Sequence, residues 1–351
     1  MAVRVRFAPS PTGSLHLGNA LTAVANRTFA DRASGAFVLR IDDTDVERNV
    51  DGGEDAILRD LEWLGIQWDE GPVRQSERAA IYRGAIRRVL EGPAVRDADG
   101  SVRLDGTTLL RPDGSATYQL ASVVDDLEMG ITHVIRGADH RPNEEVQRGI
   151  ASALGGELPE VIHHGLILGA DGKKLSKRHG HSSVEDLRND GIPASAVRLY
   201  LEELDLPTHD VHLDLARVRR LAIEAIAALT DEELAAAVNA PVMLTPALRG
   251  ARTFLEARDI AAQILTPRPV LLGDEAQPTL ERFIELRLPA AHHLDEAGAK
   301  SVLRELKAVG GDLRALRRAL TGADRGPELW AVVAALDREE ALARAAAASG
   351  R

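Results

Sequence analysis

Cysteine is absent from the 351 residues, which excludes disulfide bonds, thiolate zinc sites and a catalytic thiol. Aromatic residues make up only 3% of the chain, and alanine and leucine supply much of the 44% apolar content, a composition that favours helix. The sequence has no run of 18 consecutive apolar residues and no signal-peptide pattern at its start. We therefore expect a cytoplasmic protein with no membrane association.

An excess of basic charge is also missing. The 43 Lys and Arg face 54 Asp and Glu, a net charge of −11, and residues 201–351 alone hold 19 basic and 24 acidic side chains. A protein that grips nucleic acid along its length usually presents a basic face, so this balance argues against strong non-specific binding of that kind. The length suits two or three domains.

The pattern of apolar residues predicts an α/β N-terminal part and a helical C-terminal part. Residues 3–8 alternate as a strand does, a turn-rich loop and an amphipathic helix follow, and residues 36–43 form a second apolar run, which together predict a βαβ unit. Residues 91–117 have room for two short strands with Asp-Gly turns. Strand character returns at 132–137 and 163–169, and from about 195 onward the chain is almost wholly helical.

Four segments carry residues suited to nucleotide chemistry. PSPTGSLHLGN (9–19) joins the first strand to the first helix, whose N-terminal N–H groups suit phosphate, although such loops are often plain connections. DGKKLSKRHG (171–180) has four cationic side chains between glycines. Such a loop could bind a triphosphate, but a basic loop that only faces solvent has the same pattern. TYQLASVVDD (117–126) and VIRGADH (134–140) place polar groups beside a strand end, where ligands bind in parallel sheets.

The order of these segments resembles the class I glutamyl-tRNA synthetase family. RFAPSPTG, RIDDTD, WDEGP, RQSER, YQLASVVDD, GITHVIRG and KKLSKRHG follow one another over most of the chain, and RALTGADRGPEL near the end resembles the family's C-terminal helical domain. HLGN is similar to the family's His-x-Gly-His motif and KLSKR to its Lys-Met-Ser-Lys-Ser loop. The resemblance implies a Rossmann-type catalytic domain at 1–190, with a vestigial insertion at 91–117, followed by a helical region at 191–351.

The resemblance also implies a reaction and a site. The α-carboxylate of glutamate would attack the α-phosphorus of ATP, accompanied by Mg²⁺ and without zinc, and positioning and charge would supply the catalysis. Three groups of residues would carry it: the catalytic His16, Asn19, Lys174 and Lys177; the ATP-binding Pro9, Gly18, Leu175, Ser176 and Arg178; and the amino-acid-binding Arg6, Ser10, Asp42, Tyr118, Ser122 and Arg136. Within the last group, Arg6 and Arg136 would hold the side-chain carboxylate and Asp42 the ammonium group.

The sequence departs from the family pattern at several positions. Asp42 stands where the family usually has Glu, Ser122 where Asn is common, and Leu21 where Arg is common. Asp42 is one methylene shorter, which leaves open whether the substrate is glutamate or a close acidic analogue. The insertion that meets the tRNA acceptor end in the family is reduced here to residues 91–117.

These departures leave the acceptor open. We favour an unusual or non-tRNA acceptor, such as a small amine, a thiol or a carrier protein; conventional tRNA glutamylation and a non-catalytic ligand-binding paralogue are the alternatives. We expect a monomer. Histidine pairs such as His163–His164 and His292–His293 lack an accompanying ligand cluster, so we predict no metal site, and Asp125–Asp126 suit structural hydrogen bonds better than acid–base chemistry.

Overall fold

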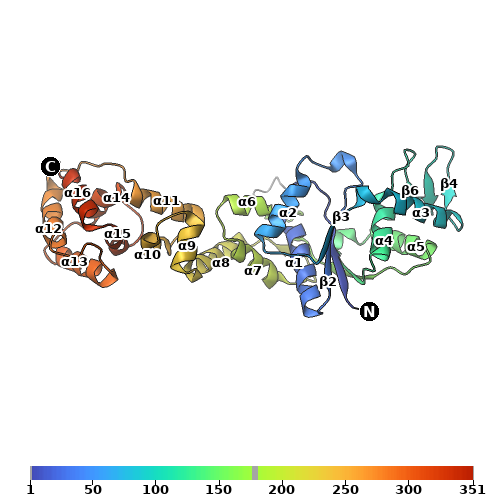
Figure 1. The fold of residues 1–351 in the computed structure, drawn as a ribbon, viewed down its shortest axis with the longest axis horizontal. Helices are drawn as coiled ribbons and strands as arrows, with labels where there is room; N and C mark the ends of the chain where they lie inside the picture. The colour runs from blue at the N-terminus through green and yellow to red at the C-terminus, as the bar shows by residue number, and fades with distance from the viewer. Residues whose placement is uncertain (1, 176–180, 351) are drawn as a thin grey trace. The chain divides into compact units, whose positions relative to one another are not determined.

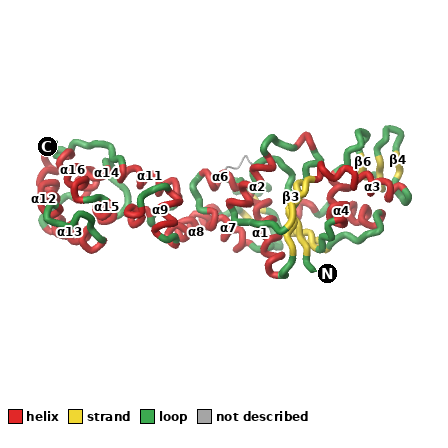
Figure 2. Tube along the Cα trace, in the orientation of Figure 1, coloured by secondary structure: helices red, strands yellow, loops and turns green. Residues whose placement is uncertain are grey.

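The computed structural model describes residues 2–175 and 181–350. They divide into two compact units, residues 1–189 with 197–215 and residues 190–196 with 216–351. All strands of the described residues lie in the first unit, as Figure 2 shows in yellow, and the second unit contains only helices and loops. No helix among the described residues is long and apolar enough to cross a membrane.

A five-stranded parallel sheet forms the centre of the first unit. Its strands lie in the order β3 (Glu70–Arg74), β2 (Ala36–Ile41), β1 (Arg4–Phe7), β7 (His133–Gly137), β8 (Glu160–His164). The chain thus builds outward from β1 through β2 to β3, then returns to the other side of β1 with β7. Parallel sheets bind ligands at such a reversal, outside the carboxyl ends of the strands. The topology therefore places the candidate site between β1 and β7.

Helices connect these strands, and their apolar faces are buried against the rest of the unit. They are α1 (Leu17–Arg32), α2 (Gly53–Trp63), α3 (Ala79–Leu90), α4 (Tyr118–Glu128) and α5 (Asn143–Ala153), all of which are labelled in Figure 1. The sheet buries the apolar side chains of Val5, Phe37 and Leu39, each 0% exposed. Helix α1 contributes Leu17, Ala20 and Leu21 to the buried apolar core, also at 0%. Burial of this kind is the main source of stability.

Residues 91–117 form a small antiparallel sheet between α3 and α4. It has three strands, β4 (Val95–Arg96), β5 (Val102–Leu104) and β6 (Thr107–Leu110), where the sequence predicted two. Asp105 and Gly106, both with positive φ, make the tight turn between β5 and β6. Val102 and Leu109 pack in one cluster with α3 and α4, so this sheet is anchored to the unit.

The predicted strand at 163–169 is wrong as a single element. Gly165 and Leu166 separate β8 from β9 (Ile167–Leu168), which pairs in parallel with β10 (Val211–His212). A Cβ at Gly165 would lie 1.9 Å from the carbonyl oxygen of His209, so only glycine allows this close approach of the two segments. The helices α6 (Val184–Asn189) and α7 (Ala194–Leu204) follow the segment that is not described.

The second unit is a bundle of short helices around its own core. After α8 (Leu215–Ala228) they are α9 (Asp231–Val238), α10 (Thr245–Leu248), α11 (Phe254–Leu265), α12 (Gln277–Arg287), α13 (Glu296–Ala308), α14 (Leu313–Thr321), α15 (Leu329–Ala335) and α16 (Arg338–Ala348). Capping side chains start many of them: Thr230 and Glu233 form a capping box, and Asp312 and Asp337 accept N–H bonds. Leu280 and Phe283 lie at the centre of the core.

Candidate active site

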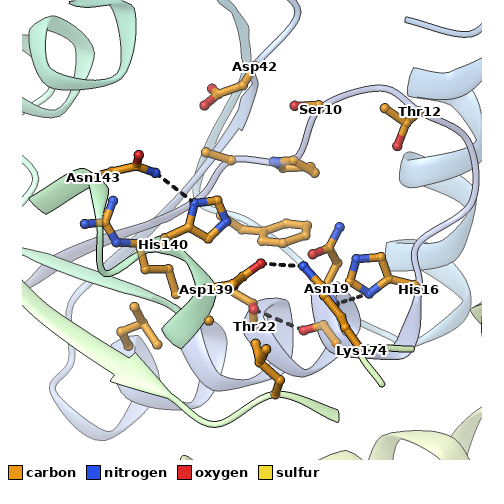
Figure 3. Close-up of a pocket in the computed structure, with 18 of the residues that line it drawn as sticks. Ser10, Thr12, His16, Asn19, Thr22, Asp42, Asp139, His140, Asn143 and Lys174 are labelled. Atoms are coloured by element: carbon orange, nitrogen blue, oxygen red, sulfur yellow. Dashed lines mark hydrogen bonds and ion pairs between the residues drawn. The ribbon is translucent and has the colours of Figure 1, made fainter. Parts of the chain in front are cut away.

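A cavity of about 550 Å³ opens at the carboxyl ends of β1 and β7, entirely within the first unit. Eleven of the fifteen predicted site residues line it: Arg6, Pro9, Ser10, His16, Gly18, Asn19, Asp42, Tyr118, Arg136, Lys174 and Leu175. Ser176, Lys177 and Arg178 lie outside the described residues, and Ser122 is buried behind the cavity wall. Figure 3 shows side chains from the two sides of the cavity converging on it.

His16 forms the N-cap of α1 on one side of the cavity. Its Nδ1 accepts a hydrogen bond from the backbone N–H of Asn19 at 3.2 Å, so Nε2 carries the hydrogen of the neutral ring and can donate it. Burial, together with the charge of Lys174, lowers the pKa of His16 to about 4. A neutral donor beside a helix N-terminus is suited to a phosphate oxygen.

Gly18, predicted to bind ATP, lines the cavity in the first turn of α1. A Cβ at this position would lie 3.1 Å from Nδ1 of His16. The absence of a side chain thus allows the imidazole of His16 to fold back over the first turn of α1.

The titration of His16 predicts a pH dependence of stability. Its pKa is about 4 in the folded protein against 6.5 ordinarily, so the unfolded chain binds more protons below pH 6.5 and acid favours unfolding. Between pH 7 and 5 we expect His16 alone to lower the free energy of unfolding by about 2 kcal/mol. Urea denaturation at the two pH values measures this. The decrease in the free energy of unfolding between pH 7 and 5 should be smaller in His16→Gln than in the parent. It should equal that of the parent in the control His293→Gln, a substitution at an exposed position. Equal decreases in all three proteins would show that His16 does not cause the pH dependence.

Lys174 lines the cavity near His16. Its backbone forms a bridge with Leu168, and its ammonium group donates to the carboxylate of Asp139, an ion pair that Figure 3 marks with a dashed line. Asp139 directly follows β7, in the short helix η3 (Ala138–His140). A phosphate entering here would compete with Asp139 for the ammonium group. His140, also in η3, lines the same wall.

Arg136 is the penultimate residue of β7 and lies 6% exposed on the wall next to β1. Its Nη1 donates to Oε1 of Gln147 at 2.8 Å and its Nε to Nε2 of His163 at 3.4 Å, while Nη2 is buried without a hydrogen-bond partner. Burial lowers the pKa of Arg136, and the nearby charge of Arg6 acts in the same direction. A buried guanidinium nitrogen without a protein partner, on a residue that lines the cavity, is a strong site for a carboxylate.

Four buried residues form an ionic cluster next to Arg136, and two of them, Arg6 and Asp42, also line the cavity. Arg40, fully buried on β2, donates through Nε and Nη2 to the two oxygens of Asp42, at 2.6 and 3.1 Å, and through Nη1 to Asp126 at 2.7 Å. Arg6 contacts the same Asp126 at 3.3 and 3.5 Å. The predicted ammonium ligand Asp42 is therefore already paired with Arg40, so any ammonium group it receives must share it.

Asp125 and Ser122 on α4 do not face the cavity. Asp125 accepts from Gln75, Arg78 and Tyr82, which makes it a structural carboxylate rather than an acid or base. Ser122 was expected to bind the amino acid, but its Oγ accepts from Nε2 of Gln147 at 3.2 Å and it is 2% exposed. It therefore contacts another protein side chain instead of the cavity.

The sequence analysis missed several cavity residues. Asp139 and His140 lie within the quoted VIRGADH segment, immediately after a predicted strand, so their position was a usable signal. Thr22 lies one turn beyond Gly18 on α1 and could have been found from helical spacing. Arg40, the first residue of the quoted RIDDTD, and Gln147 do not line the cavity but contact residues that do. The described residues contain no group of three or more His, Asp or Glu side chains able to hold a metal ion.

Comparisons with known proteins agree with this architecture. The catalytic-domain model of the class I tRNA synthetases (E and Q) matches residues 2–104 and 98–217. Glutamate--tRNA ligase 1 of Rubrobacter xylanophilus is 36% identical over 98% of this chain and 97% of its own length, and glutamate--tRNA ligase 1 of Methylorubrum extorquens is 34% identical over 97% and 98%.

A solved structure has the same fold over the whole chain. It is the crystal structure of a glutamate tRNA ligase from Elizabethkingia meningosepticum in complex with its amino acid, with a TM-score of 0.82, 22% identity, and coverage of 100% of this chain and 99% of that chain. The alignment with the Rubrobacter protein spans 421 positions, whereas this chain has 351 residues, so at least 70 aligned positions have no residue in this chain.

Proposed function

The chain belongs to the class I tRNA synthetases of the E and Q family, and we propose that it activates L-glutamate with ATP, forming glutamyl adenylate and releasing pyrophosphate. The unpaired Nη2 of Arg136 carries this proposal. It is a buried cation donor beside the end of β1, as the side-chain carboxylate of a bound glutamate requires. Glutamine, the substrate of the Q members of the family, would instead present a neutral amide to Nη2 of Arg136.

The balance of buried charge supports an acidic substrate. On the amino-acid side of the cavity, the guanidinium groups of Arg6, Arg40 and Arg136 face the carboxylates of Asp42 and Asp126. A third carboxylate, that of Asp125, lies 3.9 Å from Arg40 but is already paired with Arg78 at 2.7 Å. One positive charge is left over, and it lies at Arg136. Glutamate carries a net charge of −1 and neutralises this excess, whereas glutamine leaves a buried charge unpaired at a cost of a few kcal/mol.

The two sides of the cavity fit the two halves of the reaction. An α-carboxylate oxygen of glutamate would form a bond to the α-phosphorus, and the bond from that phosphorus to the leaving pyrophosphate would break. Nε2 of His16 and the ammonium group of Lys174 face the phosphate side, where charge develops on the leaving group. ATP is expected to carry Mg²⁺ on its phosphates, which would supply further charge neutralisation.

The acceptor is proposed from what the chain has in place of the family's acceptor-binding insertion. Only the sheet β4–β6 lies between α3 and α4, and the two matched segments of the family model overlap within it, at 98–104. Residues 201–351 carry a net charge of −5. These features favour an adenylate that forms without RNA and is passed to a small amine, a thiol or a carrier protein.

A second candidate is tRNA glutamylation by a compact enzyme. It is favoured by relatives named glutamate--tRNA ligase, which match 97% or more of this chain and thus also its helical second unit.

Pyrophosphate exchange distinguishes these functions. Labelled pyrophosphate should enter ATP when glutamate is present, undiminished after ribonuclease treatment, and at least about 100-fold more slowly with glutamine or aspartate. Exchange that depends on added tRNA, with glutamyl-tRNA recovered on an acid gel, would support the second candidate and contradict the proposed acceptor. Absence of exchange under both conditions would contradict glutamate activation itself.

A further inference from the structure

Gln147 is a buried glutamine on α5 that connects two of the predicted amino-acid-binding residues. It is 3% exposed, and its side-chain amide lies between Arg136 on β7 and Ser122 on α4. Oε1 of Gln147 accepts from Nη1 of Arg136 at 2.8 Å, and Nε2 donates to Oγ of Ser122 at 3.2 Å. Three separate elements are thus joined by one amide behind the cavity wall.

The direction of these hydrogen bonds is fixed by chemistry. A guanidinium group can only donate, so the oxygen of the Gln147 amide must face Arg136 and its nitrogen must face Ser122. The hydroxyl of Ser122 in turn points to the carbonyl oxygen of Gln119, one turn earlier on α4, at 3.5 Å. The chain of donors therefore runs from Arg136 to the backbone of α4, and a reversed amide would place an N–H against the guanidinium group.

We propose that Gln147 is the positioning residue for Arg136, and that Ser122 acts on the substrate only through Gln147. By accepting from Nη1, the amide fixes the guanidinium plane and leaves Nη2 as the nitrogen without a protein partner, which the substrate carboxylate would then take. Because the amide is neutral, it orients Arg136 without cancelling its charge. Glutamine at 147 is thereby a determinant of the preference for an acid over an amide substrate. This inference rests on the proposed function.

Two substitutions separate orientation from charge. Gln147→Leu removes the acceptor for Nη1, and we expect about a tenfold or greater rise in the Kd for glutamate with little change for ATP. Gln147→Glu keeps the shape and gives Arg136 an internal carboxylate, which balances the excess positive charge. We expect this variant to lose glutamate affinity more strongly and to lower the ratio of glutamate to glutamine affinity by about tenfold or more. Ser122→Ala should change glutamate affinity in the direction of Gln147→Leu, by a smaller factor.

Calorimetric titration of L-glutamate, L-glutamine and ATP into the full-length protein and its variants measures these changes. Gln277 is the matched control, since its side-chain nitrogen also donates within the fold, to the carbonyl oxygen of Ser349, but in the second unit. Gln277→Leu and Gln277→Glu should leave all affinities within twofold of the parent. Thermal unfolding checks that each variant is folded.

The outcomes are distinct. If the parent binds no glutamate, the proposed function fails and the inference fails with it. If the parent binds glutamate and folded Gln147→Glu keeps both the parent's affinity and its preference over glutamine, then Gln147 has only a structural role and the inference is wrong while the proposed function stands. A loss of ATP and glutamate affinity by equal factors would also contradict it, since orientation of Arg136 affects the amino acid alone.

Discussion

Replacing Arg136 by leucine is expected to raise the KM for glutamate by at least about 100-fold while leaving the KM for ATP unchanged. The substitution removes the excess positive charge and the unpaired Nη2, whereas His16 and Lys174 on the phosphate side keep their contacts. The loss of a charge-assisted contact with a carboxylate in a buried site accounts for an effect of this size. Pyrophosphate exchange at varied glutamate and ATP concentrations separates the two constants.

Arg148 provides the control for this substitution. It lies on α5 and pairs with Glu144 at the surface, with 66% of its side chain exposed, so Arg148→Leu should change neither constant. A KM for glutamate in Arg136→Leu within a few-fold of the parent would show that another group binds the side chain of the amino acid.

Replacing Lys174 by alanine is expected to lower the rate of exchange at saturating substrates on the order of 100-fold. The ammonium group lies where negative charge builds on the leaving pyrophosphate, and removal of one such group typically costs a factor of 100 to about 1,000 in rate. Because Lys174 acts on the phosphate side, the KM for glutamate should stay within about twofold of the parent.

The neighbouring Lys173 is the matched control for Lys174. It is exposed in the same turn but does not line the cavity, so Lys173→Ala should retain the parent rate. Equal losses in the two variants would indicate a general effect of charge in this segment, and a Lys174→Ala rate within threefold of the parent would exclude a direct role for its ammonium group.

The fold could be predicted where local patterns carry the information. The first strand, turn and helix lie within about thirty residues, and the observed β1 and α1 follow the expected order, as does the helical C-terminal part. The strand predicted at 163–169 failed because β9 pairs with β10, more than forty residues later in the chain. Such long-range pairing, enforced by the close approach at Gly165, leaves no local pattern.

The site could be predicted only in part, for a related reason. Arg6 occupies a strand position that alternation assigns to the polar side, and Arg40 interrupts the apolar run at 36–43, yet both are buried in contact with Asp126 on α4. Only the folded structure brings α4 against β1 and β2, so the motif predicted Arg6 as a site residue, whereas nothing in the sequence predicted Arg40 as the partner of Asp42. Gln147 was missed likewise, since its two partners lie on other elements.

The central claim is that glutamate and ATP alone form an adenylate in the cavity between β1 and β7. Its most direct measurement is mass spectrometry of the enzyme-bound product after ribonuclease-treated protein is incubated with L-glutamate, ATP and Mg²⁺ and then quenched. We predict glutamyl adenylate, with pyrophosphate released in equal amount, and far less in parallel samples of Arg136→Leu at the same glutamate concentration. Recovery of unchanged glutamate and ATP from the parent protein without RNA would contradict the claim, whether or not added tRNA restores the product.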